Sequence, residues 1–116
     1  MTDHFITKLD FVPLLRERVP RFHIEELWAA DQLGYVIAND FARYICNQAQ
    51  EFNFAEVETC LRFLESLIAK GDSYVRELVE EAMETLEYCD SFEEIESRFT
   101  VTIAGLRTKR RTKGSA

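Results

Sequence analysis

The stretch NFAEVETCLRFLESLIAKGDSYVRELVEEAMETLEY, residues 53–88, decides the fold of this chain. Apolar residues recur at steps of three and four in both of its halves, which is the spacing of an amphipathic helix. Between the halves, Gly71 is predicted to take the left-handed conformation that ends a helix, and Asp72 or Ser73 to cap the next one. Because so short a connection forces the two helices together, we expect an antiparallel pair over residues 54–70 and 73–88.

Capping signals mark further helix starts on both sides of this pair. Asn53 with Glu56, and Ser91 with Glu94, have the spacing of a capping box. In a capping box the first side chain accepts from the third helical N–H and the acidic residue reaches back to the cap. The second box predicts a last short helix after residue 91, with the apolar residues Phe92, Ile95 and Phe99 on one side.

Upstream residues follow the same helical spacing, so the sequence predicts an all-α fold, a compact bundle of about five helices with the antiparallel pair at its centre. A first helix is expected from about Asp10 to Pro20, with Pro13 in its first turn, or at a kink if the helix begins earlier through Phe5 and Ile6. A short helix or helical turn is expected within residues 21–32, with Ile24, Leu27 and Trp28 as its apolar positions. A longer helix is expected over residues 33–50, and its predicted buried stripe is Leu33, Val36, Ile37, Phe41, Tyr44, Ile45 and Ala49.

Length and composition indicate one folded domain. The chain has 116 residues, of which 47% are hydrophobic and 30% charged, values typical of a single globular core. No apolar run approaches the roughly 20 residues that cross a bilayer. The charged start does not fit a signal peptide either, so we expect a cytoplasmic protein that does not insert into a membrane. Cys46, Cys60 and Cys89 are too few and too scattered for a disulfide scaffold, and we expect small buried hydrophobes.

The charge is divided unevenly along the chain. All 21 acidic residues lie within residues 1–106 together with only nine of the 14 basic ones, so this part carries a formal charge of −12. The last ten residues hold the other five cations: Arg107, Lys109, Arg110, Arg111 and Lys113. Because a segment without large apolar residues cannot offset its ordering entropy, we expect a folded domain over 1–106 and a basic, disordered tail over 107–116.

The strongest functional signal is acidic. Nine carboxylates and no Lys or Arg lie between residues 77 and 96: Glu77, Glu80, Glu81, Glu84, Glu87, Asp90, Glu93, Glu94 and Glu96. The first five are separated by steps of three and four and therefore share one face of the predicted helix. Two interpretations remain, a solvated face that keeps the protein soluble and a docking surface for a basic protein. On the second, Tyr74 or Tyr88 serves as the apolar anchor, and the predicted partner-binding residues are Tyr74, Glu77, Glu80, Glu81, Glu84, Glu87, Tyr88 and Asp90.

Enzyme chemistry has little support in the sequence. The chain has two histidines and lacks HExxH, CxxC and Gly-rich phosphate-loop patterns, so we expect no catalytic residue, no metal and no cofactor. His23 beside Glu25 and Glu26 is predicted to be a surface residue. The acidic body argues against nucleic-acid binding, since phosphate contacts need a cationic surface. The basic tail has no aromatic residue on which a base could stack.

The string GDSYVRELVEEAMETLE, residues 71–87, resembles the second helix of a HEAT-type repeat. The matching positions are the capping Asp72, the pair Val75 and Arg76, and the alternating small and large residues Ala82 and Leu86. The resemblance implies one HEAT-like hairpin at the centre of the fold. No second copy occurs at that period, so a solenoid is not expected.

A wider resemblance rests on the order of three features. A Pro-Arg-Phe segment at residues 20–22, the string GYVIANDFARYI at 34–45 and then the hairpin are similar to a family of small, uncharacterised, all-helical bacterial proteins associated with toxin–immunity loci. The resemblance spans about residues 11–90 and carries no catalytic motif. Together with the acidic face it implies a non-enzymatic, immunity-type inhibitor of a basic effector such as a nuclease toxin. The alternative is a regulatory adaptor or homodimeric scaffold with an apolar interface.

Overall fold

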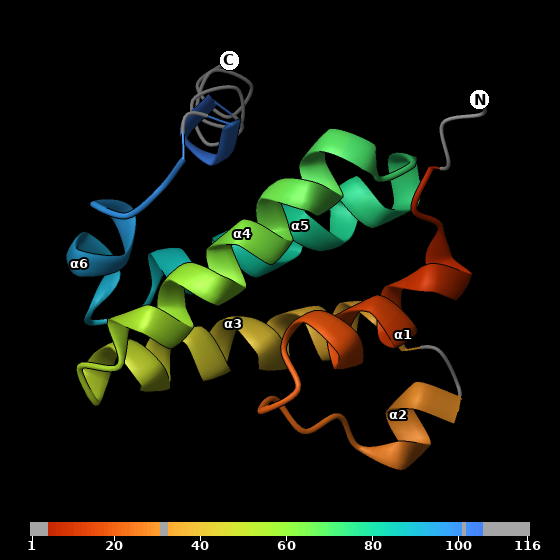
Figure 1. Ribbon diagram of the computed structural model, residues 1–116, viewed down its shortest axis with the longest axis horizontal. Helices are drawn as coiled ribbons and strands as arrows, with labels where there is room; N and C mark the ends of the chain where they lie inside the picture. Colours follow the sequence, from red (N-terminus) through yellow and green to blue (C-terminus); the bar gives the residue numbers. More distant parts are fainter. Residues whose placement is uncertain (1–4, 31–32, 101, 106–116) are drawn as a thin grey trace.

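A computed structural model describes residues 5–30, 33–100 and 102–105 of the chain (Figure 1). It confirms the all-α fold: the described residues contain no strand, only an isolated bridge between Ile6 and Gly71. The 102–105 segment adds a helical turn. The helices are α1 (Lys8–Arg18), α2 (Glu26–Ala30), α3 (Gly34–Gln50), α4 (Phe54–Lys70), α5 (Ser73–Glu87) and α6 (Phe92–Glu96).

Three long helices form the body of the bundle. The α4–α5 pair is antiparallel, as predicted, and α1 packs against both of its members. Helix α3 runs parallel to α5, because successive positions along α3 meet successive positions along α5. Tyr35 meets Glu77 near the helix starts, and Cys46 meets Cys89 near their ends. The parallel pair α3–α5 makes the most extensive contact in the fold.

Small residues allow α3 and α5 to approach closely. Gly34, Ala38 and Ala42 are buried and follow one another at steps of four, so they lie on one face of α3. A Cβ atom on Gly34 would lie 2.5 Å from the hydroxyl oxygen of Tyr74 and 3.1 Å from a methyl carbon of Leu78, both on α5. This face packs on α5, while the large side chains of Ile37, Phe41 and Ile45 are buried in the core.

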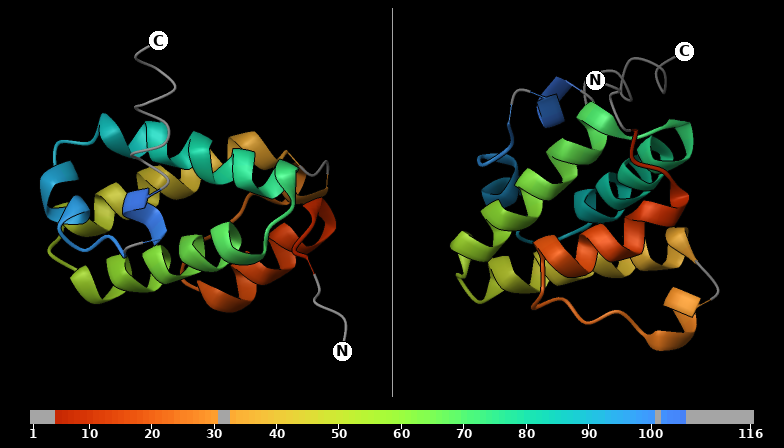
Figure 2. Two further views of the ribbon diagram at one scale, coloured as in Figure 1. Left: turned by 90° about the horizontal axis from the view of Figure 1, so that it is seen from above. Right: turned by 45° about the vertical axis from the view of Figure 1, so that its right-hand side comes forward.

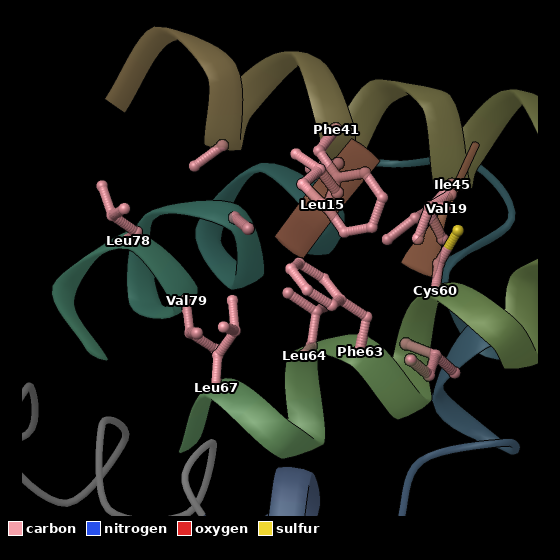
Figure 3. Packing of buried hydrophobic residues seen from close by; sticks show 14 of the residues in the cluster. Leu15, Val19, Phe41, Ile45, Cys60, Phe63, Leu64, Leu67, Leu78 and Val79 are labelled. Atoms are coloured by element: carbon pink, nitrogen blue, oxygen red, sulfur yellow. The ribbon is translucent and has the colours of Figure 1, made fainter. Parts of the chain in front are cut away.

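The packing of α3 corrects the predicted stripe. Leu33 and Val36 are exposed, because α3 turns its small residues toward α5. Leu27, an expected apolar position of the second helix, is also exposed, and α2 has no buried residue. The remaining core follows the expected positions. Figure 3 shows side chains of four helices pointing into one interior, where the rings of Phe41 and Phe63 meet edge to face at 5.9 Å. The labelled core residues are Leu15, Val19, Phe41, Ile45, Cys60, Phe63, Leu64, Leu67, Leu78 and Val79.

The first helix begins earlier than predicted, at Lys8. Thr7 and Asp10 form a capping box in which the Thr7 amide donates to the Asp10 carboxylate at 2.9 Å, so Asp10 is the third helical residue and not the cap. The preceding residues do not extend the helix. Ile6 is paired instead with the α4–α5 connection: its amide donates to the Lys70 carbonyl at 2.8 Å, and its carbonyl accepts from the Asp72 amide at 2.9 Å.

The α4–α5 connection differs from the predicted left-handed turn. Gly71 has φ −74° and ψ 147°, an extended conformation open to any residue. Glycine is needed for space: a Cβ there would lie 2.3 Å from the Leu67 carbonyl oxygen and 2.7 Å from a methyl carbon of Val75. Of the two predicted caps, Asp72 and Ser73, the structure shows Asp72, whose carboxylate accepts from the Val75 amide at 2.9 Å.

The two other predicted capping boxes are wrong. The Asn53 side chain donates to Gln48 at 2.8 Å instead of capping α4, and Glu56 accepts from the hydroxyl of Tyr44 on α3. Ser91 makes no side-chain cap to α6. At the start of α4, Asn53 and Glu56 form hydrogen bonds with residues of α3 instead of with the end of their own helix.

The cysteine prediction also needs correction. Cys46 on α3 and Cys89, just after α5, form a disulfide with their Cα atoms 6.0 Å apart. They are 43 positions apart in sequence, and only the parallel packing of α3 on α5 brings them together. Cys60 is the buried hydrophobe expected, and burial raises the pKa of its thiol well above the usual range. The predicted basic tail lies outside the described residues.

Candidate functional site

The five glutamates of α5 divide into two groups. Glu77 and Glu81 lie along the α3–α5 contact, where the Tyr35 hydroxyl donates to Glu77 at 2.7 Å and the Asn39 amide donates to Glu81 at 3.2 Å. The hydrogen bond to Glu77 raises the pKa of Tyr35 to about 12, because it favours the protonated phenol. These two predicted site residues therefore contribute hydrogen bonds between α3 and α5.

The other carboxylates continue beyond the end of α5. Glu96 of α6 is half-buried and is left aside. Of the other six, Glu80 is half-buried and the rest are exposed, along α5, in the connection after it and on α6. We call this set the acidic strip: Glu80, Glu84, Glu87, Asp90, Glu93 and Glu94. Two of its members, Glu93 and Glu94, were noticed in the sequence but not placed among the predicted site residues. They are included because both are exposed on α6, which packs against α3.

The two candidate aromatic anchors differ in exposure. Tyr74 is half-buried at the start of α5, with its ring edge-on to that of Tyr35 at 5.9 Å and the Lys8 ammonium 5.6 Å from its centroid. Its ring is therefore occupied within the fold, contrary to the expectation of an exposed side chain. Tyr88 is 90% exposed at the end of α5, beside Asp90 of the acidic strip.

Sequence reasoning missed a third aromatic residue, Phe52, in the connection between α3 and α4. Its side chain is 81% exposed, and its φ of 62° is the positive value that glycine normally supplies. Its ring lies 6.4 Å from that of Phe54, whose face carries the Arg98 guanidinium at 3.8 Å. The sequence feature that could have identified Phe52 is an aromatic residue in the turn EFNF, at a position where a glycine or asparagine is usual.

Figure 2 shows the α3–α4 connection, the end of α5 and α6 at the same end of the bundle. The disulfide between Cys46 and Cys89 joins the last part of α3 to the residue after Tyr88 at the end of α5. We call Phe52, Phe54 and Tyr88 the aromatic end. Tyr88 lies between Glu87 and Asp90 of the acidic strip in the sequence, and Arg98, which stacks on Phe54, donates to the Glu94 carbonyl.

The described part of the chain holds no group of three or more His, Cys, Asp or Glu side chains placed to bind a metal ion. An open groove of about 330 Å³ lies between α1 and α2, beside the exposed ion pair of Arg16 and Glu26 at 3.4 Å. None of its lining residues is a His or Cys: Lys8, Leu9, Val12, Pro13, Arg16, Glu26, Ala29 and Ala30. In the residues that the structure covers, no helix has the length and apolarity to cross a membrane.

Comparison with known proteins gives a family and no function. A family model described as a domain of unknown function, DUF7674, matches residues 9–100, most of the chain. The chain therefore belongs to this family, which agrees with the resemblance to an uncharacterised helical family. Neither a curated protein nor a solved structure matches it.

Proposed function

We propose that this member of the DUF7674 family is a non-enzymatic binding domain that recognises a basic protein through its acidic strip. One observation carries the proposal: six exposed or half-buried carboxylates lie on α5, in the connection after it and on α6, in a stretch of sequence with no Lys or Arg from residue 77 to 96. A surface of one charge sign speeds encounter with an oppositely charged surface and disfavours partners of like charge.

The placement of the strip on α5 supports this function. Six side chains of α5 are buried, so the helix is a rigid platform. Glu80 and Glu84 are four positions apart, and like charges at that spacing destabilise a helix by roughly 0.2–0.5 kcal/mol per pair. Glu80 and Glu84 therefore carry like charges on the same face of this helix.

An immunity-type inhibitor is the most concrete form of the proposal. Its acidic strip would cover the cationic cleft of a basic effector such as a nuclease toxin, each carboxylate pairing with a Lys or Arg of that effector. Rim contacts of this kind contribute about 0.2–1 kcal/mol each, so several must act together.

Reversing the charge of the strip is expected to abolish most of the attraction. With nona-lysine as a purely cationic probe, the full chain carrying Glu80→Lys, Glu84→Lys and Glu87→Lys should bind about tenfold more weakly than the parent, with a flatter dependence on salt. Isothermal titration at two or more salt concentrations measures both effects.

The matched control reverses three exposed glutamates on the α1–α2 side, Glu17, Glu25 and Glu26, and so changes the net charge by the same amount. This control should retain most of the parent's affinity. Equal losses in both variants would show that net charge alone governs binding and would contradict the proposed surface, as would a parent chain that does not bind nona-lysine.

A homodimeric scaffold is the second candidate. It is favoured by Leu9 and Leu27, two exposed apolar residues on the helices α1 and α2 that form the groove. An apolar dimer would persist at high salt in a light-scattering mass measurement, whereas association through the acidic strip would not.

A further inference from the structure

The connection between α3 and α4 ends α3 with a motif that normally requires glycine. The Phe52 amide donates to the Ala49 carbonyl at 3.0 Å, and the Asn53 amide donates to the Gln48 carbonyl at 2.8 Å. This pair of bonds is the Schellman motif, in which the residue after the helix cap takes a left-handed conformation. Phe52 occupies that position with φ 62°.

Phenylalanine is a poor choice there for stability. A side chain with a Cβ is strained in the left-handed region, and a bulky one is a true outlier. The strain is not compensated by burial, because the Phe52 ring is 81% exposed. Strained residues that the fold does not need are found at functional sites more often than elsewhere.

The neighbouring Arg98 shows which chemical group suits these rings. Its guanidinium lies 3.8 Å from the centroid of the Phe54 ring, a cation–π contact, and it also donates to the Glu94 carbonyl at 2.9 Å. Guanidinium groups stack on aromatic faces and pair with carboxylates, whereas ammonium groups stack less well. Phe52 and Tyr88 are further exposed rings on segments at the same end of the bundle. Asp90, Glu93 and Glu94 are exposed carboxylates in the segment that follows Tyr88.

We propose that the aromatic end is the docking site for an arginine-rich segment of the partner protein, with Phe52 and Tyr88 as stacking surfaces for its guanidinium groups. The inference rests on the proposed function, since the acidic strip supplies the charge that attracts the segment. It adds a preference for arginine over lysine and assigns that preference to two rings. The strain at Phe52 is then the cost of presenting one of them.

The test compares nona-arginine with nona-lysine as ligands of the full chain. The parent should bind nona-arginine several-fold more tightly. Phe52→Gly and Tyr88→Ala should each weaken nona-arginine binding about twofold to fivefold, the worth of one exposed cation–π contact, and leave nona-lysine binding nearly unchanged. Leu27→Ala removes an equally exposed apolar side chain from α2, at the other end of the bundle, and should change neither affinity (Figure 1).

A second readout separates a binding role from a structural one. Phe52→Gly should raise the urea midpoint of unfolding, because glycine relieves the left-handed strain, while it weakens nona-arginine binding. A lower midpoint would show that the ring supports the fold and would overturn the inference.

The remaining outcomes are also decisive. Equal affinity of the parent for the two peptides, or loss of nona-lysine and nona-arginine binding together in Phe52→Gly, would overturn the inference and leave the proposed acidic surface standing. Failure of both peptides to bind would overturn both. If replacing Arg107, Lys109, Arg110, Arg111 and Lys113 by Gln in the full chain tightens nona-arginine binding more than tenfold, the occupant is the chain's own C-terminal segment, and the inference of a partner's segment is wrong.

Discussion

Replacing Gly71 by alanine is expected to lower the free energy of unfolding by about 3 kcal/mol, the upper range for an added group in a packed region. The added Cβ would lie 2.3 Å from the carbonyl oxygen of Leu67 and 2.7 Å from a methyl carbon of Val75. The first of these is backbone at the end of α4, so it cannot rotate away. To relieve these two close contacts, α4 would have to move against α5, or the hydrogen bonds of Ile6 with Lys70 and Asp72 would have to break.

The loss should appear as a lower urea midpoint with an unchanged slope. Gly105→Ala is the matched control, because a Cβ on Gly105 has no atom within 4 Å. It should change the stability by less than about 1 kcal/mol. Similar behaviour of the two variants would contradict the close packing assigned to the α4–α5 connection.

Removing the disulfide is expected to cost about 2–4 kcal/mol. The bond joins α3 to the end of α5 across 43 sequence positions, so the double variant Cys46→Ser, Cys89→Ser gives the unfolded chain a large gain in conformational entropy. Serine also leaves two polar groups in a partly buried site. Urea unfolding of the variant beside the oxidised parent measures the difference.

Reduction gives an independent check. A thiol reductant should lower the stability of the parent toward that of the double variant and should leave the variant unaffected, because the remaining Cys60 is buried and unpaired. A parent whose unfolding midpoint does not respond to reductant would show that the two cysteines are not joined in the native protein.

The all-α fold and the central helix pair could be predicted because their signals are local. The apolar spacing from residue 53 to 88 and the cap at Asp72 each depend on residues that are only a few positions apart in the sequence. The parallel packing of α3 on α5 could not be predicted, since it depends on small residues such as Ala38 and Ala42 that carry little hydrophobic signal. The errors at Leu33, Val36 and Cys46 all follow from that one missing contact.

The same limit applies to the candidate site. The sequence shows the carboxylates but does not show which of them contact α3, because the partners of Glu77 and Glu81 lie 42 positions away in the sequence. Phe52 was missed because its importance lies in a backbone angle and an exposed ring. Tyr74 was expected to be an exposed anchor because its contacts with Tyr35 and Lys8 are tertiary.

We propose that one end of this bundle, with the acidic strip and the aromatic end, recognises a basic segment of another protein. The most direct test is to follow the backbone amide NMR signals of the isotope-labelled full chain during titration with nona-arginine. We expect the largest changes in chemical shift at residues 51–54 and 87–98. Changes centred on α1 and α2, or spread evenly over the molecule, would contradict it.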